Sequence, residues 1–531
     1  MRRLLALIAL LIPAIARAEP QQMVAAAHPL AVEAGLDVLR RGGTAVDAAV
    51  AVQMMLGVVE PQASGIGGGG FLLYYDAETR GITVYDGRET APAGATPTMF
   101  LQDGKPLPYP EAQASGLSVG APGAVALLEM AHKEHGKLPW ADLFTTSIAT
   151  ARKGFPMPPR LALSFQRMPA KRALYPQAAG NEVANPALAD TMQRIAAEGA
   201  RVLQEGPIAE EMVAQVQGHQ RPGTLAVTDL AAYKPIKREA LCGPYRVWIV
   251  CSMPPPSSGG IALLQMLGLL EPFDLRQDKP NDLRALHLIA EANRLAFADR
   301  ARHVADPAFT AVPTKQLVAP GYIAERRKLI SEERSMSGQQ PVAPGYPEHG
   351  TSHMTIVDRA GNAVAFTTTV EGPFGAGMMV GGFLLNNQLT DFSEVPERDG
   401  RPVANRVEPG KRPRSSMSPT FVLDQDRKLV LSVGSAGGAR IIGDTFQALI
   451  GMLDWNLPPQ AALDLPRVAN MNGQTEIEDK GDLPAQADAL RKLGHQVQVR
   501  RHEGGLTAIR RKGDGWEGGA DPRRDGVAKG E

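Results

Sequence analysis

The sequence predicts a mixed α+β fold, and three features of its pattern indicate this class. Residues 122–233 and 261–331 carry mostly helical periodicity, whereas strand-turn-strand patterns recur from residue 351 onward. A pair of short strands also follows two helices near the N-terminus, and such separate runs of helices and strands are typical of α+β proteins. With 531 residues, 44% of them hydrophobic, the chain is long enough to bury a large core.

Two helices are expected at the start of the folded chain. The first covers residues 29–41 and ends at Gly42-Gly43, because glycine commonly follows a helix C-terminus. The second begins at Thr44, whose hydroxyl can cap the helix, and Asp47 lies in its first turn. This helix is expected to run to about Val59.

A glycine-rich segment, residues 65–70, leads into a predicted strand at 71–75. A second strand at 82–86 places Arg88 just beyond its end. Because the glycines run into a strand and not into a helix, we expect close backbone packing there and no phosphate cradle.

The two cysteines are expected to form a disulfide across a hairpin. Cys242 and Cys251 are symmetric about a tight turn centred between Arg246 and Val247, which would place them opposite each other on paired strands. A bridge is the favoured reading for an exported chain, and a reactive thiol is the alternative. The sequence contains no CxxC pair, so a cysteine metal site is not expected.

The remaining elements follow in order. A rigid proline-rich turn at 254–260 precedes a helix at 261–270, and helices continue to about residue 331. Strands are then expected at 354–357, 363–369, 420–423 and 428–433, followed by a helix at 439–453. The polar, glycine-rich tail from Arg511 is expected to cover the surface.

The charge balance and the N-terminal residues limit which functions are expected. The 56 Lys+Arg residues balance 56 Asp+Glu residues, so a nucleic-acid or anionic membrane partner is not expected. Residues 1–18 resemble a secretory signal, with a basic start, a short apolar stretch and an Ala16-Arg17-Ala18 cleavage site. The mature chain would begin near Glu19 in the periplasm or outside the cell, and an uncleaved anchor is the alternative.

Thr351 is the most informative candidate for catalysis. It follows an irregular stretch rich in proline and glycine, residues 341–347, and begins a strand. If the chain were cut before it, Thr351 would carry a hydroxyl and a free α-amine, whose pKa of about 7.7–8.0 makes it a base near neutral pH. One residue would then supply both nucleophile and general base.

The loop Gly434 to Gly438, between a strand and a helix, is the second candidate. Successive backbone amides at a helix N-terminus favour negative charge, so the loop could be an oxyanion hole, a phosphate loop or a structural turn. It matches neither common nucleotide-binding pattern. In an oxyanion hole, Gly437 and Gly438 would let their amides approach the developing charge without a Cβ in the way.

Other polar residues are harder to assign. His132 and His135 lack a third ligand at metal spacing, so a solvated helix face is expected. His353 should share a strand face with Thr351, where it either supports the site or simply packs. Ser415 and Ser416 offer hydroxyls and amides to a carboxylate, although composition alone indicates only a polar loop.

Taken together, the chain resembles the γ-glutamyltransferases, members of the N-terminal-nucleophile hydrolase group. Each piece is only moderately specific, but their joint order is very specific and covers residues 23–523. The motifs are Pro61-Gln62 through Gly70-Phe71, Arg88-Glu89 with Ala91-Pro92, residues 254–260, Thr351-Ser352-His353, Asn386-Asn387-Gln388 with Asp391-Phe392, residues 412–419 and residues 434–438.

The resemblance implies a four-layer αββα sandwich and a precursor that cuts itself between Gly350 and Thr351. The products would be a large subunit, 19–350, and a small subunit, 351–531, which remain together as a heterodimer. No metal or cofactor is implied.

The resemblance also implies roles for individual residues. Thr351 would attack the γ-carbonyl of a donor such as glutathione, and the resulting ester would pass to water, an amino acid or a dipeptide. Thr369 would hydrogen-bond the nucleophile, and the Gly437 and Gly438 amides would hold the oxyanion. The residues implied in donor binding are Arg88, Ser415 and Ser416 for the α-carboxylate, and Gln388, Asp391 and Glu371 for the α-ammonium.

Two departures from the family pattern bear on specificity. Glu371 stands where better-known members carry asparagine, which changes the pocket charge, although a carboxylate can also bind an ammonium. The stretch 393–409 is shorter than the lid of the enterobacterial type and lacks a tyrosine, which favours an open site and hydrolysis.

Three other functions compete with this one. A glutaryl or cephalosporin side-chain acylase could use the same scaffold, but Asp391 favours an α-amino donor. A non-catalytic periplasmic binding protein would keep the fold without cutting. A nucleotide-binding enzyme is more distant, since its loop motif is missing.

Overall fold

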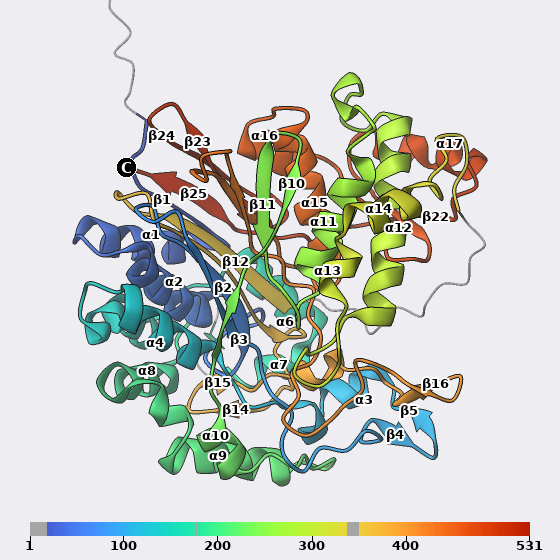
Figure 1. Ribbon diagram of the computed structural model, residues 1–531. Coiled ribbons are helices and arrows are strands. Elements are labelled where there is room, and N and C mark those ends of the chain that lie inside the picture. Colours follow the sequence, from blue (N-terminus) through green and yellow to red (C-terminus); the bar gives the residue numbers. More distant parts are fainter. Residues whose placement is uncertain (1–18, 176–177, 180, 337–349) are drawn as a thin grey trace, which may run out of the picture.

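The computed structural model describes residues 19–175, 178–179, 181–336 and 350–531. The expected signal segment and the stretch 341–347 lie outside these ranges. Two large sheets lie face to face, and helices cover the outer face of each sheet (Figure 1). This is the expected αββα sandwich, and the α+β prediction is confirmed.

The first sheet has seven antiparallel strands in the order β25-β1-β12-β13-β2-β3-β9. They are β1 (Met23–Ala26), β2 (Gly69–Tyr75), β3 (Ile82–Gly87), β9 (Ile236–Glu239), β12 (Gly350–Val357), β13 (Ala363–Glu371) and β25 (Val527–Gly530). The hairpin expected after residue 351 is β12–β13, and it lies in the middle of the sheet. Thr351 therefore belongs to a strand that is paired on both sides.

The second sheet has six antiparallel strands in the order β10-β11-β18-β19-β23-β24. They are β10 (Leu241–Tyr245), β11 (Trp248–Ser252), β18 (Thr420–Leu423), β19 (Leu429–Gly434), β23 (Thr507–Lys512) and β24 (Gly515–Ala520). The loop after β19 is the glycine segment considered as an oxyanion hole. The layered arrangement brings this loop and the start of β12 to the same region of the molecule.

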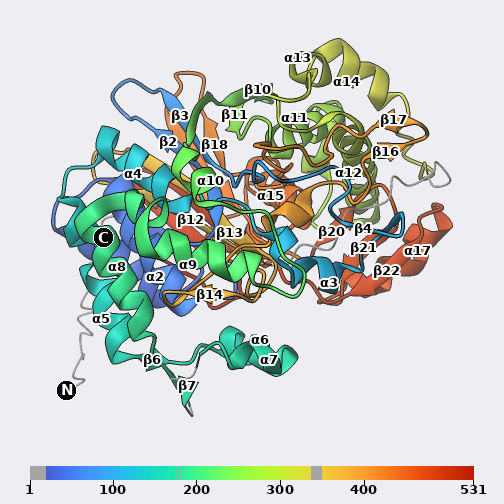
Figure 2. The same cartoon turned by 90° about the horizontal axis from the view of Figure 1, so that it is seen from below.

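Helices form the outer layers, and Figure 2 shows the same layers from below. On the first sheet lie α1 (Pro29–Arg40), α2 (Ala45–Val59), α4 (Ala124–His135), α5 (Thr145–Lys153), α8 (Pro186–Glu198) and α9 (Gly206–Gln217). On the second sheet lie α11 (Gly259–Leu270), α12 (Leu283–His303), α14 (Pro320–Arg327), α15 (Arg440–Leu453) and α16 (Pro459–Asp464). Among the described residues, no helix combines the length and apolar character needed to cross a membrane.

Shorter elements connect these layers. The short helices are α3 (Tyr109–Gln113), α6 (Pro159–Arg167), α7 (Pro169–Arg172), α10 (Val227–Ala232), α13 (Thr314–Leu317) and α17 (Ala487–Lys492). A small sheet contains β20 (Val468–Asn470), β21 (Thr475–Glu478) and β22 (Val497–Arg500). Two-residue strands are β4 (Leu101–Gln102), β5 (Lys105–Pro106), β6 (Phe155–Pro156), β7 (Ala178–Ala179), β8 (Glu182–Val183), β14 (Met379–Val380), β15 (Phe383–Leu384), β16 (Glu397–Arg398) and β17 (Arg401–Pro402).

The helix expected from Thr44 begins there because its first turn is capped from both sides. The Thr44 hydroxyl accepts a hydrogen bond from the Asp47 amide at 3.2 Å, and the Asp47 carboxylate accepts one from the Thr44 amide at 2.9 Å. These two bonds satisfy amides that have no partner within the helix. The predicted start of α2 is therefore confirmed.

Alternation along β12 decides where the Thr351 side chain points. Met354 and Ile356 lie in the apolar core between this sheet and its helices. Residues of the opposite parity face the second sheet, where the His353 ring lies against Gly434 of β19. A Cβ at Gly434 would fall 2.4 Å from that ring. Thr351 has the same parity as His353 and therefore points into the space between the sheets.

The glycine-rich segment at 65–70 packs backbone against backbone, as expected. A Cβ on Gly68 would lie 2.0 Å from the Thr369 carbonyl oxygen, and one on Gly67 would lie 2.1 Å from the Leu384 carbonyl oxygen. Only glycine allows these approaches without moving the chain. The segment thereby brings the start of β2 against the end of β13, which carries Thr369.

The C-terminal tail is integrated into both sheets, so the expectation that it only covers the surface is wrong. Strand β24 forms one edge of the second sheet, and β25 pairs with β1 at the edge of the first. Its polar, glycine-rich sequence lacked a strand signal because an edge strand is only partly buried. The short strands β1 and β9 also escaped prediction.

The two histidines of α4 are not on a solvated face. The His135 ring stacks on Tyr74 with centroids 3.8 Å apart, and its Nε2 lies 2.8 Å from the Tyr85 hydroxyl. His132 Nε2 lies 3.0 Å from the Leu138 carbonyl oxygen. Both side chains are half-buried, because α4 turns this face toward the sheet and the following loop.

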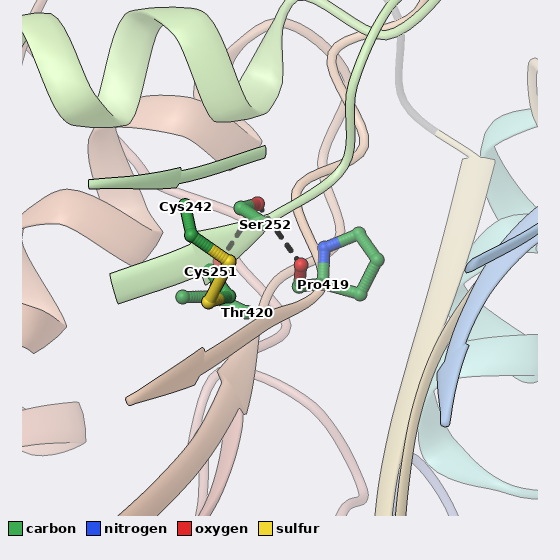
Figure 3. Close-up of a disulfide and its surroundings, with 5 residues drawn as sticks. All are labelled: Cys242, Cys251, Ser252, Pro419 and Thr420. Atoms are coloured by element: carbon green, nitrogen blue, oxygen red, sulfur yellow. Dashed lines mark hydrogen bonds between the residues drawn. A yellow bond between two sulfur atoms is a disulfide. The ribbon is translucent and has the colours of Figure 1, made fainter. Parts of the chain in front are cut away.

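The cysteine hairpin forms β10 and β11, and Cys242 and Cys251 are joined by a disulfide with an S–S distance of 2.06 Å (Figure 3). The next residue, Ser252, donates to the Pro419 carbonyl at 2.9 Å and accepts from Thr420 at 3.0 Å. The bridge thus ties the edge strand β10 to β11, which is itself anchored to β18.

Candidate active site

A small pocket lies at the start of β12, between the two sheets. Its lining residues come from both halves of the sequence: Arg88, Thr351, Thr369, Glu371, Gln388, Asp391, Ser415, Ser416, Met417 and Ile441. The fold therefore brings together eight of the residues singled out from the sequence. Met417 and Ile441 supply the apolar part of the wall.

The Thr369 hydroxyl is the hub of the contacts around Thr351. It lies 3.2 Å from the Thr351 hydroxyl, from which it accepts a hydrogen bond, and it also accepts one from the Glu371 amide at 2.8 Å. Its own proton is donated to the Gly350 carbonyl oxygen. The carbonyl that precedes Thr351 is therefore polarised by a side chain that also contacts the Thr351 hydroxyl.

The strand pairing is irregular at this point. Thr351 pairs with Thr369, whereas Gly350 pairs with Glu371, so one extra residue of β13 is accommodated between them. Gly350 cannot be replaced without a shift, because a Cβ there would lie 2.5 Å from the Glu371 carbonyl oxygen. Glu371 itself has a φ of +77°, a value that is rare for a residue with a side chain. The bulge and this conformation place the Glu371 side chain in the pocket wall.

A buried charged network holds the backbone behind Thr351. Arg524 donates to the Thr351 carbonyl oxygen and, through Nε, to the Gly504 carbonyl oxygen at 2.9 Å. The Ser352 hydroxyl donates to the Glu60 carboxylate at 2.8 Å. Strand β12 is thus fixed on both faces beside the residue expected to react.

His353 packs beneath the site and does not line the pocket. Its Nδ1 lies 2.8 Å from the Thr367 hydroxyl, and burial lowers the pKa of the imidazole to about 3. The ring is therefore neutral at ordinary pH. Of the two roles left open for His353, the structure favours packing.

Arg88 also lines the pocket, and its guanidinium is held by several contacts. Its Nη2 donates to Asp391, and further bonds run to the Pro413 carbonyl oxygen at 3.1 Å and the Arg414 carbonyl oxygen at 2.9 Å. Asp391 also accepts from the Gln388 side-chain amide at 2.7 Å. This buried pair combines a cation with a carboxylate, so the pocket can receive a ligand that carries both charges.

Ser415 and Ser416 are held by the proline-rich turn and by α12. The Ser258 hydroxyl donates to the Ser415 carbonyl oxygen at 2.7 Å, and Arg300 donates to the Ser416 hydroxyl at 2.6 Å. Arg300 also donates to the Ser258 hydroxyl at 2.9 Å. The turn at 254–260 therefore positions the two serines.

Glu371 is a buried carboxyl whose two oxygens differ. Oε2 accepts hydrogen bonds from the Tyr109 hydroxyl, 3.0 Å away, and from the Asn387 side-chain amide. Oε1 is buried and has no hydrogen-bond partner among the described residues. Burial, together with the nearby charge of Asp391, raises the pKa of Glu371 to about 8.

Gly437 and Gly438 connect β19 to α15 and are buried, and neither is among the residues that line the pocket. Their φ values of +124° and +65° lie in the region that favours glycine. The first turn of α15 contains Ile441, which lines the pocket. The role of the Gly437 and Gly438 amides in an oxyanion hole therefore stays a prediction, and the sequence of the loop does not support a phosphate site.

A family model described as Gamma-glutamyltranspeptidase matches residues 31–531. The chain belongs to the gamma-glutamyltranspeptidase family. A relative named glutathione hydrolase proenzyme, from Bacillus subtilis (strain 168), is 39% identical over 545 residues, which cover 96% of this chain and 91% of the relative. A protein of the same name from Escherichia coli (strain K12) is 36% identical over 535 residues, covering 95% and 90%. Among solved structures, a cephalosporin acylase from Bacillus halodurans has a TM-score of 0.86 at 29% identity and covers 99% of both chains.

In this family member, several residues that hold the pocket residues in place had not been assigned a role from the sequence. Tyr109 comes from the short helix α3 and Arg524 from the C-terminal tail, and no local pattern marks either of them. Asn387 belongs to the Asn386-Asn387-Gln388 motif of the sequence, so this motif could have predicted its contact with Glu371. Arg300 sits on the long helix α12, and its burial, which would mark it as unusual, is seen only in the structure.

One group of metal-ligating residue types lies elsewhere in the described part of the chain. It consists of His287, Glu291 and His495, all buried. The two imidazoles hydrogen-bond directly, with His287 Nδ1 2.7 Å from His495 Nε2. This spacing leaves no room for an ion between them, and the group is not part of the pocket.

Proposed function

We propose that the protein is a self-processing γ-glutamyl hydrolase and transferase that acts on glutathione and similar donors. The observation that carries the proposal is the Thr351 hydroxyl, which is hydrogen-bonded to Thr369 in a pocket that is also lined by the Arg88–Asp391 ion pair. A nucleophile therefore faces a site for an amino acid headgroup.

Processing begins with attack of the Thr351 hydroxyl oxygen on the Gly350 carbonyl carbon. The C–N bond breaks, an ester forms, and the hydroxyl proton passes to the released amine. Water then hydrolyses the ester, leaving a Gly350 carboxylate and a free α-amine on Thr351. The hydrogen bond from Thr369 to the Gly350 oxygen supports this step, since that oxygen becomes negative during attack. The products are subunits 19–350 and 351–531, which stay together because β12 and its neighbours belong to one sheet.

Turnover uses the new N-terminus. The Thr351 amine takes the hydroxyl proton as Oγ attacks the γ-carbonyl of the donor, and the amides of Gly437 and Gly438 stabilise the oxyanion. The proton passes to the departing amine, and a γ-glutamyl ester remains on Thr351. Water resolves the ester by hydrolysis, and an amino acid or dipeptide resolves it by transpeptidation.

The pocket supplies partners for both charges of the donor headgroup. Arg88, Ser415 and Ser416 would bind the α-carboxylate. An ammonium has three N–H donors, and three acceptors are at hand: the Asp391 carboxylate, Gln388 Oε1 and Glu371 Oε1. The last two oxygens are buried without a partner among the described residues, which a bound ammonium would correct.

The test combines processing with activity. On a denaturing gel, the purified protein should give two bands, with a new N-terminus at Thr351 by mass spectrometry, and Thr351→Ala should give one. The processed protein should release p-nitroaniline from γ-glutamyl-p-nitroanilide. Full turnover by an uncut chain, or cleavage at another residue, would refute the proposal.

A second candidate is hydrolysis of glutaryl side chains, as in the cephalosporin acylases. The full-length structural match to such an acylase favours it. Comparing γ-glutamyl-p-nitroanilide with glutaryl-p-nitroanilide separates the two, because these donors differ only in the α-amino group.

The proposed location is the periplasm or the cell exterior. Residues 1–18 would act as a secretory signal, and the disulfide is consistent with an oxidising compartment. A mature N-terminus near Glu19 in the exported protein is the expected result, and recovery of residues 1–18 in the mature chain would contradict it.

A further inference from the structure

The pocket contains more carboxyl groups than cations. Glu371 and Asp391 both line the pocket, whereas Arg88 is the one basic residue among the described residues that line it. Arg88 is already committed to Asp391. Glu371 therefore has no counter-ion of its own in the described part of the chain. A second buried carboxylate beside the first is costly, so the proton-bound form of Glu371 is favoured when the pocket is empty.

Hydrogen bonding decides which oxygen of Glu371 carries that proton. Oε2 accepts from the Tyr109 hydroxyl and from the Asn387 amide, which occupies both of its lone pairs. The proton must therefore sit on Oε1, the oxygen that has no other partner. A protonated Glu371 presents an O–H donor at the place where an ammonium needs an acceptor.

From this geometry we propose that Glu371 is a protonation-dependent specificity residue. Its ionised form accepts γ-glutamyl donors, and its protonated form accepts desamino donors of the glutaryl class, giving the enzyme a second amidase activity in acid. The inference rests on the proposed function and adds to it a selection between two donor classes by pH.

Electrostatics predicts the direction of the change. A γ-glutamyl donor brings an ammonium that stabilises the Glu371 carboxylate, so its binding releases a proton at pH values below the pKa of about 8. A glutaryl donor brings only a carboxylate, which an ionised Glu371 repels. The kcat/KM for γ-glutamyl donors should therefore level off above that pKa, whereas the ratio of γ-glutamyl to glutaryl turnover should keep rising with pH across it.

Other titrating groups near the pocket must be separated from Glu371. The charged groups that face it are Asp391 and Arg88, and the neutral Tyr109 hydroxyl donates to it. The Thr351 α-amine, once exposed by processing, titrates nearby but acts on both donors alike. Burial also raises the pKa of Glu89 to about 8, although Glu89 does not line the pocket.

The experiment measures kcat/KM of the processed protein for γ-glutamyl-p-nitroanilide and glutaryl-p-nitroanilide between about pH 5.5 and pH 8.5. Their ratio cancels the titration of Thr351 and of the leaving group, and the donor's own amine is corrected by its separately measured pKa. The ratio should rise by up to about tenfold per pH unit below the pKa of Glu371. In Glu371→Gln, which cannot ionise, the ratio should not change with pH. Tyr109→Phe removes a donor to Oε2 and should move the rise to higher pH.

The matched control is Glu89→Gln, which removes a buried carboxyl of similar pKa outside the pocket. It should keep the pH dependence of the wild-type protein. A constant ratio in the wild-type protein, or an unchanged slope in Glu371→Gln, would overturn the inference. Absence of γ-glutamyl hydrolysis at every pH would instead overturn the proposed function, so the two failures are distinguishable.

A binding measurement tests the inference even if the Glu371→Gln precursor does not cleave itself. L-glutamate binding to the processed wild-type protein is measured by calorimetry at about pH 7 in buffers with different heats of ionisation. The dependence of the binding heat on the buffer should show that nearly one proton is released per site. Glutarate, which lacks the ammonium, should release none. Equal proton release by the two ligands would contradict the role of Glu371.

Discussion

The hydroxyl of Thr369 offers the sharpest test of the processing chemistry. Thr369→Val removes this hydroxyl at nearly constant volume, and with it the bonds to the Gly350 oxygen, the Thr351 hydroxyl and the Glu371 amide. The Gly350 oxygen becomes the oxyanion, and loss of one such donor costs about 3–4 kcal/mol, or roughly 10²- to 10³-fold in rate. The variant should therefore accumulate as a single band on a denaturing gel that converts slowly to two.

The assay is a time course of freshly purified precursor, with the cut confirmed by mass spectrometry. Thr369→Ser restores the hydroxyl and should restore most of the rate. The matched control is Thr368→Val on the same strand, because the Thr368 hydroxyl is buried without a hydrogen-bond partner in the described structure. Cleavage of Thr369→Val at close to the wild-type rate, or equal slowing in the Thr368 control, would refute the reasoning.

The remaining predictions concern donor binding and stability. Arg88→Ala and Asp391→Ala should process normally but lose about 10²- to 10³-fold in kcat/KM for γ-glutamyl-p-nitroanilide, because each leaves its buried partner unpaired; failure of both to process would show that they maintain the fold. Replacing Cys242 and Cys251 by serine should lower the free energy of unfolding by roughly 2–3 kcal/mol through the lost loop constraint, as measured by denaturant titration, with kcat of the folded protein unchanged; an unchanged midpoint would contradict this. His353 has an ordinary pKa of 6.5 when unfolded and about 3 when folded, so the unfolded chain takes up a proton first as pH falls. Stability should thus decline below pH 6.5, by about 2 kcal/mol for this group at pH 5, and His353→Gln should reduce that decline in urea titrations at the two pH values.

Local signals in the sequence were sufficient for most of the fold. The α2 helix follows from the Thr44 cap, and the central hairpin follows from apolar and β-branched residues on either side of a polar turn. The edge strands could not be predicted in the same way. Strand β25 has only four residues, Val-Ala-Lys-Gly, and it is a strand because β1 offers it an unpaired edge.

The site shows a similar division. The family pattern pointed to the residues that line the pocket, since their spacing in the chain is distinctive. It could not identify Tyr109, which enters from a short helix and reaches Glu371 only through the fold. The protonation of Glu371 also could not be predicted from the sequence, because it depends on burial and on the pairing of Arg88 with Asp391.

By itself, the sequence determined the chemical groups and their order: a threonine at the start of a strand, an arginine after another strand and a glycine loop before a helix. Periodicity and capping are local properties, so they can be read from neighbouring residues. Tertiary structure alone decided which hydroxyl polarises the Gly350 carbonyl, which arginine holds the Thr351 backbone and which carboxyl lacks a counter-ion. These depend on contacts between residues that are 19, 173 and 303 positions apart in the chain and on their removal from water, and neither can be read from a linear pattern.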